Sequence, residues 1–176
     1  MPPNVIRGVT LSLGIAVCLT AAPVRPANAA DQALIEETNR QVVRDAFEGW
    51  EAGTFNVFDL LDEDVVWTIT GFDSVVSGTY RGKKELLSRT VEPFSERMSE
   101  RLSPTLRELW ADGDEVLIHF DGEGRTAAGD VYRNSYLWIF TMEGDAVTEV
   151  TAFLDTAAFA ALLARDPVNA PDERTD

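Results

Sequence analysis

Cysteine, histidine and basic residues are scarce in this 176-residue chain. Cys18 is the only cysteine and His119 the only histidine, so a zinc site lacks its usual ligands, and no spacing typical of a calcium loop appears. We therefore expect no metal and no cofactor. The chain has 15 basic and 30 acidic residues and a net charge of −15, which argues against nucleic acid and anionic membranes as partners.

The one long apolar run lies near the N-terminus, over residues 9–22. It is short for a membrane span, and it is followed by two prolines and the small-x-small site Ala27-Asn28-Ala29. This layout predicts a secretory signal peptide over residues 1–29, with a retained anchor as the alternative. We expect a secreted or periplasmic protein with no membrane contact after cleavage. Cys18 would leave with the signal, so packing alone would hold the mature domain together.

The remaining sequence predicts a single domain over residues 30–165 and a disordered polar tail over residues 166–176. Apolar residues at helical spacing predict helices over 31–53, 54–61, 83–98 and 156–165, the third kinked at Pro93. Alternating residues predict strands over 64–70, 102–111, 115–125, 131–141 and 147–154. This order is typical of an α+β fold in which a curved, mostly antiparallel sheet wraps on three to four helices. Such helices leave a cavity where they fall short.

The hairpin over residues 131–154 is the most informative stretch. Its turn contains Gly144, which tolerates a positive φ, and Asp155 is suited to cap the final helix. One face of its first strand carries Tyr132, Asn134, Tyr136, Trp138 and Phe140. This mixture of polar and aromatic residues indicates a pocket wall, although a dimer surface is also rich in aromatic residues.

Four stretches carry a resemblance to a known family. They are Ala52-Gly53 with residues 60–67 (LLDEDVVW), residues 78–82 (GTYRG), residues 132–136 (YRNSY), and Glu149-Val150 with residues 153–156 (FLDT). Together they resemble the nuclear-transport-factor-2-like superfamily and its SnoaL-like branch, which includes polyketide cyclases and relatives of ketosteroid isomerase. The resemblance implies a cone-shaped α+β barrel, a homodimer formed through the outer sheet face, and a deep pocket for a small hydrophobic or polycyclic molecule. Relatives include isomerases, cyclases, hydrolases and non-catalytic binders, so the fold alone does not decide the function.

The catalytic residues of relatives are incomplete in this sequence. By the resemblance, the isomerase base falls near Ile69 and its oxyanion tyrosine near Ala46, while the second oxyanion position falls near Tyr136. The resemblance also places the second acid of the epoxide hydrolases at Ala152. Of these positions, only Tyr136 has a side chain able to donate a hydrogen bond.

His119 and Asp121 are the remaining candidates for catalysis. Residues two apart on a strand point to the same side, and a carboxylate beside an imidazole raises its basicity. The pair could act as a general base, with Tyr136 as the donor. Asp73 is a further candidate acid. If His119 and Asp121 face outward instead, Ile118 and Phe120 line the cavity and the hypothesis fails.

Four residues are predicted to bind the ligand: Trp67, Phe72, Asn134 and Trp138. Phe72 lies in an unusually apolar loop, which would either pack down or close over the pocket. Trp67 is equally suited to an ordinary core position. We therefore expect an exported protein that binds a small hydrophobic molecule, with proton-transfer activity of the isomerase or cyclase type. The alternative is a non-catalytic binding or dimeric assembly module.

Overall fold

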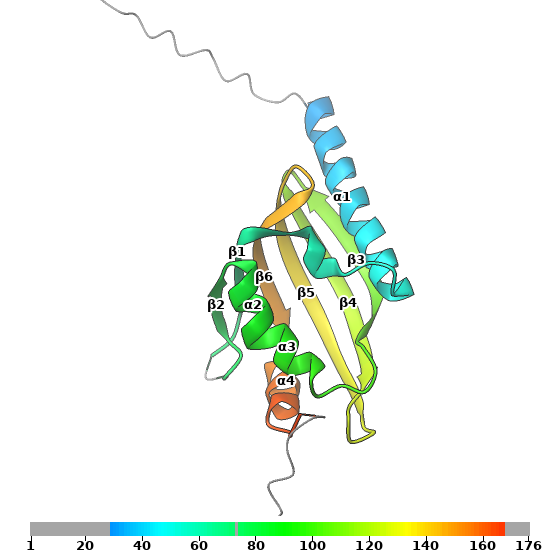
Figure 1. The fold of residues 1–176 in the computed structure, drawn as a ribbon. Helices are drawn as coiled ribbons and strands as arrows, with labels where there is room; N and C mark the ends of the chain where they lie inside the picture. Colours follow the sequence, from blue (N-terminus) through cyan, green and yellow to red (C-terminus); the bar gives the residue numbers. More distant parts are fainter. Residues whose placement is uncertain (1–28, 73, 168–176) are drawn as a thin grey trace, which may run out of the picture.

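The computed structural model describes residues 29–72 and 74–167, and it consists of one sheet with helices packed on one face (Figure 1). The predicted signal peptide lies outside this part of the chain, apart from Ala29, as does most of the predicted tail. The strands are β1 (Leu61–Ile69), β2 (Gly78–Arg81), β3 (Ser103–Asp112), β4 (Glu115–Arg125), β5 (Val131–Glu143) and β6 (Ala146–Leu154). The helical elements are α1 (Ala29–Ala52), η1 (Val57–Leu60), α2 (Lys83–Leu86), η2 (Leu87–Val91), α3 (Glu92–Ser95) and α4 (Thr156–Leu163). None of the helices described here is both long enough and apolar enough to cross a membrane.

The six strands lie in the order β2-β1-β6-β5-β4-β3. Only β1 and β6 run parallel, and every other neighbouring pair is antiparallel. The predicted α+β class and the mostly antiparallel sheet are therefore confirmed. The sheet does not close, because β2 and β3 are free edges. The expected barrel is thus an open, mixed sheet.

The helix predictions hold for α1 and α4 and need correction between them. Gly53 follows α1 with φ 74°, a left-handed conformation typical of helix C-termini. The expected second helix is a single 3₁₀ turn, η1, and its cap is Asn56, whose side chain accepts a hydrogen bond from the Phe58 backbone. Short strand β2 was not expected from the sequence.

The helix around Pro93 contains a π turn, η2, in place of the expected simple kink. Proline has no backbone N–H, so a regular α-helical hydrogen-bond ladder cannot continue through it. One step earlier, the Glu92 N–H bonds to the Leu87 carbonyl, five residues back. The wider turn holds Thr90 in a buried position, where its hydroxyl donates to the Leu86 carbonyl at 2.7 Å.

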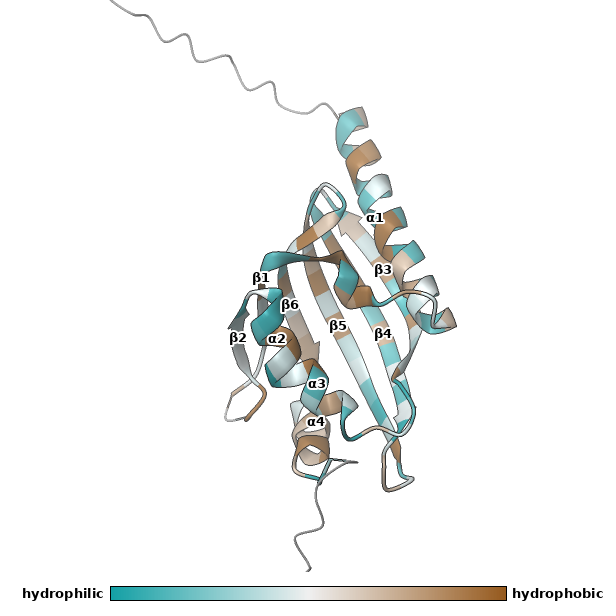
Figure 2. Ribbon diagram, in the orientation of Figure 1, coloured by the Kyte–Doolittle hydropathy of each residue, from teal (hydrophilic) through white to brown (hydrophobic). Residues whose placement is uncertain are grey.

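Alternation along β4 and β5 decides which residues form the core. The even-numbered residues of β5 from Tyr132 to Met142 are buried, as the sequence predicted for this face. In β4 the buried residues are Val116, Ile118, Phe120 and Gly122. Figure 2 shows the same alternation of apolar and polar residues along α1 and the long strands. The helices therefore cover one face of the sheet, called here the inner face.

Candidate functional site

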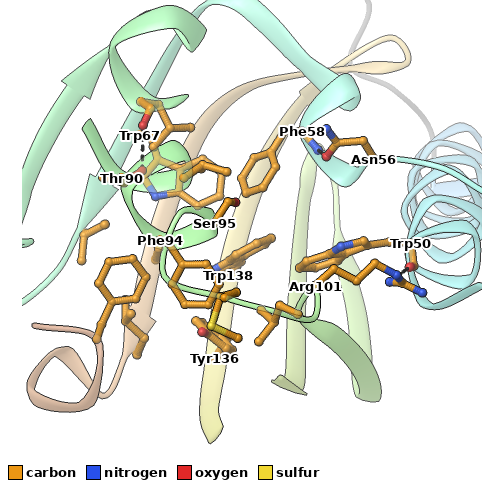
Figure 3. Close-up of a pocket in the computed structure, with 18 of the residues that line it drawn as sticks. Trp50, Asn56, Phe58, Trp67, Thr90, Phe94, Ser95, Arg101, Tyr136 and Trp138 are labelled. Carbon is orange, nitrogen blue, oxygen red and sulfur yellow. Dashed lines mark hydrogen bonds between the residues drawn. The ribbon is translucent and has the colours of Figure 1, made fainter. Parts of the chain in front are cut away.

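A cavity of about 410 Å³ lies between the inner face of the sheet and the helical segment from α2 to α3 (Figure 3). Small-molecule sites have volumes of roughly 300–1,000 Å³, so this cavity is large enough for one. Most of its lining is apolar and comes from three strands, β1, β5 and β6, and from the helical elements α1, η1, α2, η2, α3 and α4. Its inner walls are formed by Trp50, Phe58, Trp67, Ile69, Leu86, Thr90, Phe94, Tyr136, Trp138, Ala152 and Phe159.

Trp138, at the centre of β5, joins the aromatic walls. Its ring stacks on Trp50 of α1 with centroids 6.0 Å apart and planes 13° from parallel. Trp67 of β1 packs edge to face against the same ring, with centroids 5.0 Å apart. Offset and edge-to-face pairs of this kind each add about 0.5–1.5 kcal/mol beyond simple burial. The cavity wall is therefore a rigid part of the core.

Ile69 and Ala152 lie side by side in the sheet and both line the cavity. Ala152 is also the register partner of Trp138 on its other side. The small side chain at this position leaves cavity space beside Trp138. These are the two positions at which the resemblance places catalytic carboxylates, and here they are apolar.

Tyr136 is the polar group of the inner wall. Its hydroxyl lies 3.1 Å from that of Tyr132, which also accepts a hydrogen bond from Asn134 Nδ2 at 2.8 Å. Asn134 is fixed in turn by two hydrogen bonds to the backbone of Asp155. Burial raises the pKa of Tyr136 well above its ordinary value of 10. Tyr136 is therefore a neutral group at physiological pH, held in place by a chain of hydrogen bonds.

The mouth of the cavity is polar. Four of the lining residues are exposed: Asn56, Ser95, Ser99 and Arg101. Arg101 Nη1 donates to the carbonyl of Trp50 and Nη2 to that of Glu51, both at 2.7 Å. These bonds fix the guanidinium at the C-terminal end of α1, beside the ring of Trp50 (Figure 3). Arg101 is also the only charged residue among those that line the cavity in the described part of the chain.

His119 and Asp121 lie on the opposite face of the sheet. In β4 they alternate with Ile118 and Phe120, which are fully buried on the inner face. The expectation that this pair points into the cavity is therefore wrong. The cause is the register with β5: Phe120 pairs with Tyr136, which lines the cavity, so His119 must face outward.

The two side chains are held by neighbours on the outer face. His119 Nε2 lies 3.4 Å from Ser135 Oγ, and Arg107 Nε donates to Asp121 at 2.8 Å. Hydrogen bonds from Ser135 and then Arg107 lower the pKa of Asp121. A carboxylate with a lowered pKa is a weaker base, so this environment does not favour proton abstraction.

The other predicted site residues are divided between the cavity and the surface. Trp67, Tyr136 and Trp138 line the cavity together. Asn134 does not line the cavity; it donates a hydrogen bond to the hydroxyl of Tyr132, which in turn contacts Tyr136 of the cavity wall. Phe72 is 96% exposed at the tip of the β1–β2 loop and does not close over the cavity. Asp73 lies outside the described residues.

Several lining residues were not assigned to the site from the sequence. Trp50 and Phe58 follow the apolar stripes of their helices, and nothing in that pattern separates a cavity wall from the core. Thr90 enters the cavity through the π turn, and Arg101 lies in an irregular segment between α3 and β3. The only sequence signal for Thr90 is its position shortly before Pro93.

A family model supports the relationship that the sequence motifs indicate. The model of the SnoaL-like domain matches residues 43–150, which is more than half of the chain. The chain belongs to the SnoaL-like domain family. The matched region of this SnoaL-like domain includes strands β1 to β5, the first half of β6 and most of the residues that line the cavity. No curated protein matches the chain significantly.

Solved structures agree on the fold. Bal32a from a soil-derived mobile gene cassette has a TM-score of 0.59 at 16% identity, over 73% of this chain and 98% of its own. A putative SnoaL-like polyketide cyclase from Jannaschia sp. CCS1 has a TM-score of 0.58 at 19% identity, over 76% and 96%. An NTF2-like protein from Burkholderia xenovorans LB400 has a TM-score of 0.53 at 24% identity, over 73% and 97%. At these identities the likeness describes the fold, not the activity.

Proposed function

We propose that this SnoaL-like domain binds a small, planar, largely apolar molecule in its cavity and performs no acid–base chemistry on it. The observation that carries the proposal is the composition of the wall. Trp50, Trp67 and Trp138 present aromatic surface to a space of about 410 Å³. Within the described part of the chain, no Asp, Glu or His lines this space. Such walls suit a flat, apolar molecule.

Proton-transfer chemistry of the isomerase or cyclase type is the competing function. It requires a base within hydrogen-bond reach of the substrate. Ile69 and Ala152 have no ionisable group, and the carboxylate of Asp121 is paired with Arg107 on the other face. Tyr136 can orient a bound carbonyl, but its raised pKa makes it a poor base at neutral pH. These contacts favour binding over catalysis.

The proposal is tested by titrating the mature protein with a panel of planar bicyclic and tricyclic compounds. Binding is followed by quenching of tryptophan fluorescence and by the rise in melting temperature. We expect saturable binding that Ala152→Phe abolishes, because the larger side chain fills the cavity beside Trp138. His119→Ala is the matched control, since it changes the outer face only. Turnover of a bound carbonyl compound, detected as solvent deuterium incorporated at carbon, would instead support the enzyme.

We also propose that the domain forms a homodimer through the outer face of its sheet. Trp110 and Phe153 are 48% and 43% exposed there, and they share a shallow groove with Leu117 and Leu137. These residues are neighbours across β3, β4, β5 and β6. A contiguous patch of exposed large apolar side chains supports an interface between copies of the chain.

We further propose that the protein is exported, with a secreted or periplasmic location. The support comes from the sequence alone: an apolar run, prolines and a small-x-small site precede residue 30. Helix α1 begins at Ala29, so cleavage there would release the complete folded domain. N-terminal sequencing of the protein recovered from its native host tests this, and a chain that still begins at Met1 would contradict it.

A further inference from the structure

The cavity combines an apolar interior with a mouth that offers hydrogen-bond donors. Trp67 and Trp138 in the interior are 3% and 6% exposed, whereas Asn56, Ser95 and Arg101 at the mouth are in contact with water. The side-chain Oδ1 of Asn56 accepts a hydrogen bond from the Phe58 backbone N–H at 3.1 Å, so the two N–H groups of the Asn56 side chain are directed elsewhere. A ligand that enters with its apolar part first leaves its other end among these donors.

Arg101 is fixed before any ligand arrives. Its two hydrogen bonds to the carbonyls of Trp50 and Glu51 use two of the five N–H donors of the guanidinium. Gly53 makes this close approach possible, because a Cβ at that position would lie 3.0 Å from Arg101 Nη2. A side chain that is already ordered loses little conformational entropy when it binds a further group.

The charge of Arg101 has no protein partner among the described residues. No carboxylate lies within salt-bridge distance of it, although the chain has twice as many acidic as basic residues. Glu100, its neighbour in sequence, pairs instead with Arg125 at 3.6 Å. An unpaired guanidinium at the mouth of an apolar cavity is suited to a ligand carboxylate, which it binds through parallel N–H donors.

We infer that the ligand of this cavity is an aromatic acid, with its ring against the wall that Trp67 and Trp138 form and its carboxylate at Arg101. The inference rests on the proposed binding function and adds the charge of the ligand to it. The carboxylate would stay partly hydrated at the mouth, which avoids the cost of burying a charge. Asn56 and Ser95 would supply further donors. A net charge of −15 repels an anionic ligand at long range, and the Arg101 guanidinium opposes this repulsion locally, at the mouth of the cavity.

The test compares two probes of the same shape, 2-naphthoate and its neutral amide, 2-naphthamide. We expect the wild-type domain to bind the naphthoate about 10-fold more tightly, the ratio that one charge-assisted hydrogen-bond pair at an exposed site gives. Arg101→Gln should reduce this ratio to about 1. Arg101→Lys keeps the charge but not the planar guanidinium, so its naphthoate-to-naphthamide affinity ratio should fall to about one third of the wild-type ratio.

Arg97→Gln is the matched control. Arg97 also donates to two backbone carbonyls, those of Arg165 and Pro93, both at 2.8 Å, and it does not line the cavity. The Arg97→Gln variant therefore loses hydrogen bonds comparable to those lost in Arg101→Gln, and it should keep the full preference for the naphthoate. A loss of preference in Arg97→Gln as large as that in Arg101→Gln would overturn the assignment to Arg101.

The outcomes separate the two proposals. Equal binding of naphthoate and naphthamide by the wild type would leave the cavity as an aromatic-binding site and overturn the inference about charge. Tighter binding of the amide would overturn it as well. Binding of neither probe, with no displacement of the compounds found in the panel, would contradict the binding function and the inference together.

Discussion

The ring of Trp50 in α1 and the ring of Trp138 in the sheet form an offset stack, with planes 13° from parallel. One ring lies in the last turns of α1 and the other at the centre of β5. Both also pack against Phe120, at 5.7 and 4.7 Å. The same pair thus closes one side of the cavity and attaches the first helix to the sheet, so stability and binding depend on shared contacts.

Replacing Trp138 by alanine should therefore affect both properties. The loss of a buried indole should cost about 3–5 kcal/mol in the free energy of unfolding, measured by urea denaturation. Phe72→Ala is the control, and it should cost no more than about 0.5 kcal/mol because that side chain is 96% exposed and lies outside the outer groove. Equal losses for the two variants would contradict the central position of Trp138.

The tyrosines should titrate abnormally. Burial raises the pKa values of Tyr80, Tyr132 and Tyr136, the only three tyrosines in the chain. Because the folded-state values exceed the unfolded ones, this stabilisation is complete below about pH 10 and is lost as the pH rises through the folded-state values. The absorbance of tyrosinate should therefore appear together with unfolding, and Tyr136→Phe should reduce the loss of stability at high pH. Tyrosinate that forms near pH 10 in a chain with unchanged circular dichroism would show that these side chains are exposed.

His119 and Asp121 should be dispensable for binding in the cavity. Both lie on the far side of the sheet from it, and sites without shared contacts act independently. His119→Ala and Asp121→Asn should each change the dissociation constant of a cavity ligand by less than about twofold. A tenfold or larger change, measured by isothermal titration calorimetry, would restore the role that the sequence suggested for them.

The side chain of Asp155 should stabilise the fold by capping helix α4, which begins at the next residue. Its side chain accepts hydrogen bonds from the backbone of Ala157 and Ala158, both at 3.0 Å. Asp155→Ala should cost about 1 kcal/mol of folding stability, whereas Asp155→Asn, which can still cap, should cost little. The hydrogen bonds with Asn134 use the backbone of residue 155 and persist in both variants. A larger loss in the asparagine variant would indicate that the charge itself is required.

The proposed dimer predicts a concentration-dependent mass in sedimentation experiments. Trp110→Asp and Phe153→Asp place a charge in the outer groove and should yield monomers at concentrations at which the wild type is dimeric. Phe72→Asp is the control, because that side chain is exposed on the β1–β2 loop, away from the groove. A wild-type chain that is monomeric at all concentrations would reject the dimer.

Local patterns predicted most of the elements and one face of the cavity. Burial alternates along the whole of β5, and the face that carries Tyr132, Asn134 and Tyr136 is the buried one, as expected for a pocket wall. The cap at Asp155 depends only on residues that adjoin it in sequence, and it is confirmed. Predictions of this kind succeed because the deciding contacts are local.

Predictions failed where the deciding contact is distant in sequence. In β4, Leu117 and His119 alternate with Ile118 and Phe120, and three of these four residues are apolar, so hydropathy alone did not choose the inner face. The choice is made by the pairing of Phe120 with Tyr136. Arg101 reaches the cavity only because α1 ends beside it, a relationship that spans about fifty residues of sequence. Strand β2 is only four residues long and exists because β1 offers it a partner.

The open sheet has a practical consequence for anyone who shortens this protein. The β3 edge is ten residues long, and α1 runs along it (Figure 1). The helix also covers the inner face there, through Val43 and Phe47, which are almost completely buried. A version trimmed to the family match at residue 43 would lose the first half of α1, including Glu36 and Asn39, which hydrogen-bond to Gly113 at the end of the β3 edge. Exposed strand edges recruit other strands, so such a version should aggregate where the chain from residue 30 does not.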